Sequence, residues 1–127
     1  MKKNILVIDD DSSTRVLIRF VLEKAGYCVF EAANGMKGIQ IFNKNKIDLI
    51  VTDIIMPEKE GLETIIELRK TCPEIKIIAI SAGEGDVSKQ NEYLDLANNL
   101  GADQVVGKPI IGIGKERLLN SVKALLG

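Results

Sequence analysis

Five short apolar runs alternate with segments of helical periodicity along the chain, and no linker or low-complexity stretch separates them. Each run has the length of a strand, and the runs occupy residues 5–8, 27–31, 49–52, 75–80 and 104–106. Between and after them we expect five helices: over about 14–25, after 35, over 62–68, up to about 100, and over 115–126. We expect the first of these helices to carry Leu17, Phe20 and Val21 on one apolar face. Near-continuous apolar strands that alternate with helices indicate a parallel sheet with helices on both faces.

The order of the strands follows from the handedness of their connections. Right-handed crossovers leave few arrangements, and we expect a doubly wound five-stranded α/β sheet of order 2-1-3-4-5. In this order the first and third strands are neighbours, and the winding direction reverses between them. Ligands of such sheets bind at the carboxyl ends of the strands at this reversal. With 127 residues, the chain is expected to form a single domain, 1–127, with no room for a separate output module.

Charged residues follow three of the apolar runs where each run ends. Asp9, Asp10 and Asp11 follow the first run, Asp53 follows the third, and Lys108 follows the fifth. Aspartates at the same edge of a parallel sheet converge in an acidic pocket, which is unfavourable unless a cation fills it. A pocket of carboxylate oxygens suits Mg²⁺, and a further carboxylate can accept a phosphoryl group as a nucleophile. We expect Asp11 to be a dipole partner of the first helix or simply solvated, and Ser12 or Ser13 to be the N-cap of that helix.

Composition excludes several classes of function. The chain has no histidine, which rules out a histidine base, a histidine metal ligand and a phosphorylated histidine. A net charge of −1 gives no basic surface for nucleic acid or anionic lipid. No apolar stretch is long enough for a membrane span, and the N-terminus does not resemble a signal peptide. Cys28 and Cys72 lack CxxC spacing, so we expect two reduced, mostly buried thiols in a cytoplasmic protein.

The motifs together resemble the receiver domain of two-component response regulators, CheY-like in size and in its (βα)5 fold. The resemblance covers the whole chain and rests on five positions in the right order. They are the acidic pair Asp9-Asp10, Asp53 with Met56-Pro57, Gly61, Ser81, and Lys108-Pro109.

The resemblance implies a role for each site residue. Asp53 is the phospho-acceptor, and Asp9 and Asp10 hold Mg²⁺ together with Asp53 and the backbone carbonyl of Ile55. Ser81 donates a hydrogen bond to the phosphoryl group. Lys108 pairs with its negative charge, as suits a compact ammonium. The Lys108–Pro109 bond is expected to be cis.

The same resemblance implies a signalling switch that catalyses only its own phosphorylation and dephosphorylation. A histidine kinase or histidine phosphotransfer protein supplies the phosphoryl group. The signal then passes to an unidentified protein target through protein–protein contact, because phosphorylation shifts a two-state equilibrium. Neither nucleic acid nor a membrane is an expected partner of this chain.

The sequence departs from the family pattern at three places. Val105 stands where the family usually has an aromatic residue, which leaves the usual aromatic switch open. The segment from Ser81 to Gly101 is longer than in compact members, and we expect residues 83–89 to form a mobile loop that shapes a partner surface. Ile55 and Gly83 cannot orient a water, so we expect slow autodephosphorylation.

Two other functions remain as alternatives. A haloacid-dehalogenase-like phosphatase would use Asp9 as its nucleophile, with Asp11, Ser81 and the lysine in supporting roles. Against it, Glu116 is the only acidic residue after that lysine, and Asp53 would have no function. The other alternative is a degenerate receiver that acts as a constitutive interaction module. The complete set of acidic residues argues against this alternative, while Val105 in place of an aromatic residue leaves it open.

Overall fold

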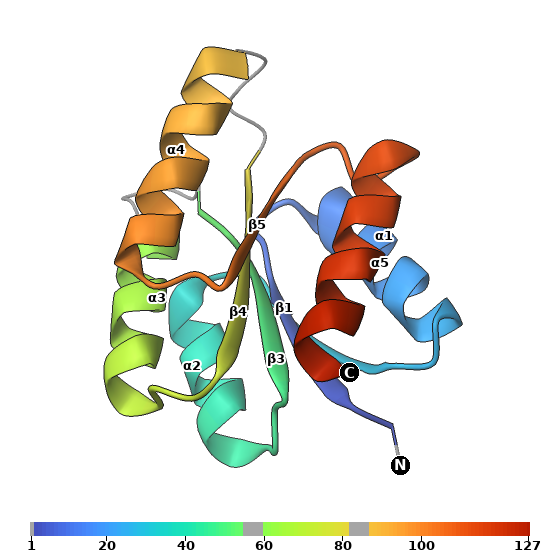
Figure 1. The fold of residues 1–127 in the computed structure, drawn as a ribbon. Coiled ribbons are helices and arrows are strands. Elements are labelled where there is room, and N and C mark those ends of the chain that lie inside the picture. Colours follow the sequence, from blue (N-terminus) through green and yellow to red (C-terminus); the bar gives the residue numbers. More distant parts are fainter. Residues whose placement is uncertain (1, 55–59, 82–86) are drawn as a thin grey trace.

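The computed structural model describes residues 2–54, 60–81 and 87–127, with a three-layer arrangement of helices around a central sheet (Figure 1). The strands in these segments are β1 (Asn4–Ile8), β2 (Cys28–Ala32), β3 (Leu49–Asp53), β4 (Lys76–Ser81) and β5 (Gln104–Gly107). The helices are α1 (Ser12–Lys24), α2 (Gly35–Lys44), α3 (Glu60–Thr71), α4 (Val87–Leu100) and α5 (Ile113–Leu126).

The strands lie in the order β2-β1-β3-β4-β5, and every pair is parallel. This confirms the predicted doubly wound sheet and places the winding reversal between β1 and β3. Each strand boundary differs from the predicted one by no more than one residue. One difference matters for the site, since Asp53 and Ser81 are the last residues of β3 and β4 rather than residues beyond them.

Alternation along the central strands divides the core between the two faces of the sheet. Ile5 and Val7 of β1 belong to the cluster that includes residues of α1 and α5. Leu6 and Ile8 belong to the cluster that includes residues of α3 and α4. Figure 1 shows α1 and α5 on one side of the sheet and α2, α3 and α4 on the other. Both faces are therefore covered by helices, and the polar residues gather at the carboxyl ends of the strands.

The first helix begins differently from the prediction. Its N-cap is Asp11, whose carboxylate accepts hydrogen bonds from the Ser13 amide at 3.2 Å and the Thr14 hydroxyl at 2.6 Å. The expectation of a serine cap at Ser12 or Ser13 is wrong, because both serines are already helical. Of the two expectations for Asp11, the interaction with this helix is the one that the structure shows, and it takes the form of an N-cap.

Three further expectations need correction. Phe20 was placed on the inward face of the first helix, but it is 62% exposed, because it lies half a turn away from the buried Ile18 and Leu22. Cys28 is exposed rather than buried, as the first residue of the edge strand β2, while Cys72 is partly buried; both are free thiols. The predicted loop over 83–89 is wrong for residues 87–89, which belong to α4, and its residues 83–86 lie outside the described segments.

Among the helices that the structure describes, none combines the length and the apolar character needed to cross a bilayer.

Candidate functional site

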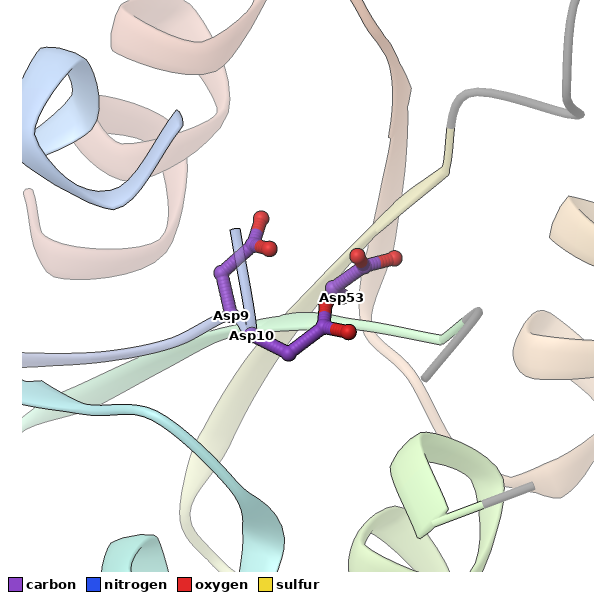
Figure 2. A group of neighbouring side chains, drawn as sticks. All are labelled: Asp9, Asp10 and Asp53. Atoms are coloured by element: carbon purple, nitrogen blue, oxygen red, sulfur yellow. The ribbon is translucent and has the colours of Figure 1, made fainter. Parts of the chain in front are cut away.

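Three aspartates from two neighbouring strand ends meet at the edge of the sheet. Asp9 and Asp10 directly follow β1, and Asp53 ends β3 (Figure 2). One carboxylate oxygen from each residue lies within 4.8 Å of the others. Asp9 and Asp53 are buried, and Asp10 is exposed. The parallel pairing of β1 with β3 therefore brings together residues that are 43 to 44 positions apart (53 minus 10 and 53 minus 9).

Lys108 brings a positive charge to this cluster from the end of β5. Its ammonium nitrogen lies 2.9 Å from Asp9 Oδ2 and 3.1 Å from Asp53 Oδ2. The lysine side chain is only 13% exposed. Burial alone would lower the pKa of Lys108, but the attraction of Asp53 and Asp9 outweighs it, so the pKa is raised and the ammonium stays charged.

The backbone around Lys108 is held against the neighbouring strand. The Lys108 amide donates to the carbonyl of Ser81 at 2.9 Å, which continues the pairing of β4 with β5. The predicted cis bond between Lys108 and Pro109 is confirmed.

Ser81 ends β4, the strand that separates β3 from β5. It is fully buried, and it follows Ile80, which pairs with Asp53 across the sheet. The structure thus brings Ser81 to the same edge as the aspartates and Lys108. Ile55, the predicted source of a backbone ligand, lies outside the described residues, as does Gly83.

The donor set suits a divalent cation. All three candidate ligands are carboxylates, and hard cations such as Mg²⁺ prefer oxygen ligands. Asp9 Oδ1 accepts the Asp11 amide at 2.9 Å, whereas the buried Oδ2 accepts no hydrogen bond within the described part of the chain and meets only the Lys108 charge. A buried carboxylate oxygen left in this way is a ready ligand position.

One contact at the site was not predicted from the sequence. The Arg15 guanidinium of α1 donates from Nη1 to the main-chain carbonyl of Asp9 at 2.7 Å. An arginine one turn inside a helix carries no signal of its own, and its partner on β2, Glu31, is 16 residues later in the chain. Only the sheet order brings the two together, so no local motif could have identified this pair.

Val105 lies on β5, and its side chain is exposed. Valine lacks the ring that the family usually carries at this position. Val105 thus leaves the usual aromatic switch open, as the sequence indicated.

The fold and the site together define a class of protein. The family model of the response regulator receiver domain matches residues 5–123. The chain therefore belongs to the response regulator receiver domain family, as the sequence motifs indicated, and the phosphatase alternative is not favoured.

Individual relatives agree with this assignment. Response regulator MprA of Mycobacterium sp. (strain KMS) is 35% identical over 126 residues, which cover 99% of this chain and 51% of that protein. The chain thus spans about half the length of that response regulator. Sporulation initiation phosphotransferase F of Bacillus subtilis (strain 168) is 33% identical over 95 residues, covering 74% of this chain and 77% of that protein.

Among solved structures, the response regulator protein TrrA of Thermotoga maritima, in complex with Mg²⁺-BeF, has a TM-score of 0.81 at 33% identity. The match covers 98% of this chain and 99% of that one. The agreement extends over the whole sheet and both helix layers, and it confirms the predicted fold.

Proposed function

We propose that this chain is a receiver domain, 1–127, that accepts a phosphoryl group on Asp53 in a Mg²⁺-dependent reaction. The observation that carries the proposal is the convergence of three carboxylates with the Lys108 ammonium at the winding reversal of the sheet. The Mg²⁺-BeF complex of the similar TrrA supports a cation at such a site.

Asp53 is the proposed acceptor because its carboxylate ends the central strand and touches Lys108. An oxygen of this carboxylate attacks the phosphorus of a phosphohistidine on the donor. The new O–P bond forms as the P–N bond breaks, and the electron pair leaves with the donor's imidazole nitrogen. The product is an aspartyl phosphate, which is a covalent intermediate open to carboxylates.

Asp9 and Asp10 are the proposed metal ligands, with Asp53 and the Ile55 carbonyl completing the protein ligand set. A bound Mg²⁺ supplies charge neutralisation on the transferring phosphoryl oxygens. Lys108 supplies a fixed positive charge that is already within contact distance of Asp53. Ser81 supplies a hydroxyl at the end of the adjacent strand.

The proposed donor is a histidine kinase or a histidine phosphotransfer protein, and the proposed output is contact with another protein. The chain acts as a switch located in the cytoplasm, with no catalysis beyond its own phosphorylation and dephosphorylation. The 127 residues contain no histidine, so the donor imidazole lies outside them.

Phosphorylation by acetyl phosphate in Mg²⁺ tests the proposal. We expect a mass increase of one phosphoryl group that maps to Asp53, and no increase in Asp53→Asn or in excess chelator. Modification at Asp9 would support the phosphatase alternative. A chain that stays unmodified under conditions that phosphorylate a known receiver would support the degenerate module.

A further inference from the structure

Arg15 links the first helix to the peptide bond between the two acidic residues of the site. Its Nη1 donates to the carbonyl of Asp9 at 2.7 Å, and its Nε donates to Glu31 Oε1 at 3.0 Å. The Arg15 side chain is only 18% exposed. A guanidinium that is held at two nitrogens by acceptors from two different strand ends has little freedom to rotate.

Glu31 orients this guanidinium from β2. One of its carboxylate oxygens accepts from Arg15, and the other accepts from Arg19 at 2.6 Å. Arg19 also pairs with Glu23 at 3.1 Å, is 44% exposed, and within the described part of the chain has no ion pair or hydrogen bond with the three aspartates of the site. The hydrogen bond from Arg19, together with that from Arg15, outweighs burial and lowers the pKa of Glu31, so this carboxylate is charged at neutral pH.

The amide and one carboxylate oxygen of Asp9 are held by the backbone, while the other carboxylate oxygen meets Lys108. Its amide donates to the Ala32 carbonyl at 3.1 Å, and its Oδ1 accepts the Asp11 amide at 2.9 Å. The carbonyl belongs to the peptide plane that joins Asp9 to Asp10. Among the described residues, Arg15 is the one whose side chain donates a hydrogen bond to this carbonyl. A rotation of this plane would change the direction of both carboxylates.

We propose that Arg15, oriented by Glu31, is a positioning residue that fixes the Asp9–Asp10 peptide and so preforms the cation site. The inference rests on the proposed function, because it assumes that these two aspartates hold Mg²⁺. Groups that orient metal ligands without touching the metal commonly change metal affinity by one order of magnitude or more when they are replaced.

Positioning and electrostatics predict opposite signs for one substitution. Arg15 carries a positive charge near the site, so its removal in Arg15→Gln would tighten Mg²⁺ binding if only charge mattered. Loss of the hydrogen bond to the Asp9 carbonyl would weaken binding if positioning dominates. Arg15→Lys leaves the charge unchanged but removes the planar two-armed donor, so charge alone predicts no effect.

Mg²⁺ titration calorimetry on the folded full chain tests the proposal, with wild type, Arg15→Gln, Arg15→Lys and the control Arg19→Gln. We expect the Kd for Mg²⁺ to rise roughly tenfold in both Arg15 variants. Arg19→Gln also removes one positive charge from the network around Glu31, but Arg19 does not contact Asp9. The Kd of this variant for Mg²⁺ should therefore stay within about twofold of wild type. Thermal unfolding in chelator shows separately how far each substitution affects the metal-free fold.

The outcomes separate this inference from the proposed function. Wild-type binding of Mg²⁺ with unchanged or tighter binding in both Arg15 variants would overturn the inference and leave the function standing. An equal loss of affinity in Arg19→Gln would also overturn it, because the effect would then belong to the whole charge network. A wild-type chain that neither binds Mg²⁺ nor accepts a phosphoryl group on Asp53 would overturn both.

Discussion

The ammonium of Lys108 pairs with the carboxylate of Asp53 at 3.1 Å, although their strands β5 and β3 are not neighbours in the sheet. The lysine reaches over the end of β4, and at the same time it contacts Asp9 Oδ2 at 2.9 Å. One cation thus compensates two buried carboxylates. In the absence of a metal ion, this lysine is what makes the acidic cluster compatible with a folded state.

Lys108→Met should therefore destabilise the metal-free protein by about 3 kcal/mol, near the lower end for a broken buried ion pair because the site lies at the edge of the sheet. Added Mg²⁺ should restore most of this loss, since a divalent cation can compensate the same carboxylates. Urea unfolding in chelator and in Mg²⁺ measures both values. Lys70→Met, at an exposed position of α3, is the matched control. An equal loss in both conditions would contradict the assigned role of the lysine.

Asp10→Asn should separate the metal site from the fold. Asp10 is exposed and lies near two buried carboxylates, so its neutralisation relieves repulsion and should cost no stability in chelator. Mg²⁺ stabilises the wild-type protein against unfolding by an amount that depends on the Kd for Mg²⁺. This stabilisation should be smaller in Asp10→Asn, because the variant has lost the charge of one proposed ligand. Thermal unfolding with increasing Mg²⁺ measures this.

Asp95→Asn, at an exposed position of α4, removes the same charge away from the cluster and should respond to Mg²⁺ as wild type does. If Asp10→Asn also responded as wild type does, Asp10 would not be a ligand.

The Glu31 carboxylate gives the stability of the protein a component that depends on pH. Hydrogen bonds from Arg19 and Arg15 lower its pKa from 4.5 in spite of partial burial. A lowered folded-state pKa contributes stability that is present above 4.5 and is lost as the pH falls through the lowered value. The difference in unfolding free energy between wild type and Glu31→Gln should therefore be largest near neutral pH and shrink below 4.5. Urea unfolding from about pH 6 to pH 3 measures it, and a constant difference would contradict this origin.

The sequence was sufficient for the parts of the site that depend on strand ends. Periodicity defined the strands, and handedness defined their order. Together these placed Asp9, Asp53 and Lys108 at one edge without any knowledge of side-chain geometry, whereas Ser81 was added by the resemblance to the receiver family. Such residues are predictable because the carboxyl ends of parallel strands all lie at the same edge of the sheet, and the strand order then determines which ends are neighbours.

Contacts between elements that are distant in sequence were not predictable in the same way. Arg15 and Glu31 meet because β2 pairs with β1, and neither residue belongs to a local motif. Similarly, Arg69 of α3 donates to the carbonyls of Ile75 and Gly101 and to Asp103, and this joins three segments through one side chain. Phe20 was placed inward because it is apolar, although helical spacing from Ile18 and Leu22 directs it outward.

Gly61 provides a test of how closely α3 approaches the acceptor strand. A Cβ atom added at this buried position would meet the carbonyl oxygen of Asp53 and would lie 2.6 Å from the Ile54 Cα. Both neighbours are backbone atoms, so neither can turn aside as a flexible side chain could. Glycine is thus required here by the approach of the helix to the end of β3.

Helix propensity and packing predict opposite results for Gly61→Ala. Alanine within a helix is favoured over glycine by about 1 kcal/mol, so propensity alone predicts a more stable protein. The backbone clash requires α3 to move away from β3, and overpacking of this kind costs about 1–3 kcal/mol beyond that gain. We therefore expect a net loss of stability, measured by urea unfolding, and slower phosphorylation of Asp53 by acetyl phosphate. Glu63→Ala, at an exposed position of the same helix, should be nearly neutral in both measurements. A Gly61→Ala protein as stable as wild type would show that α3 can move away from β3 without loss of stability. The close contact between Gly61 and the end of β3 would then not be needed to position Asp53.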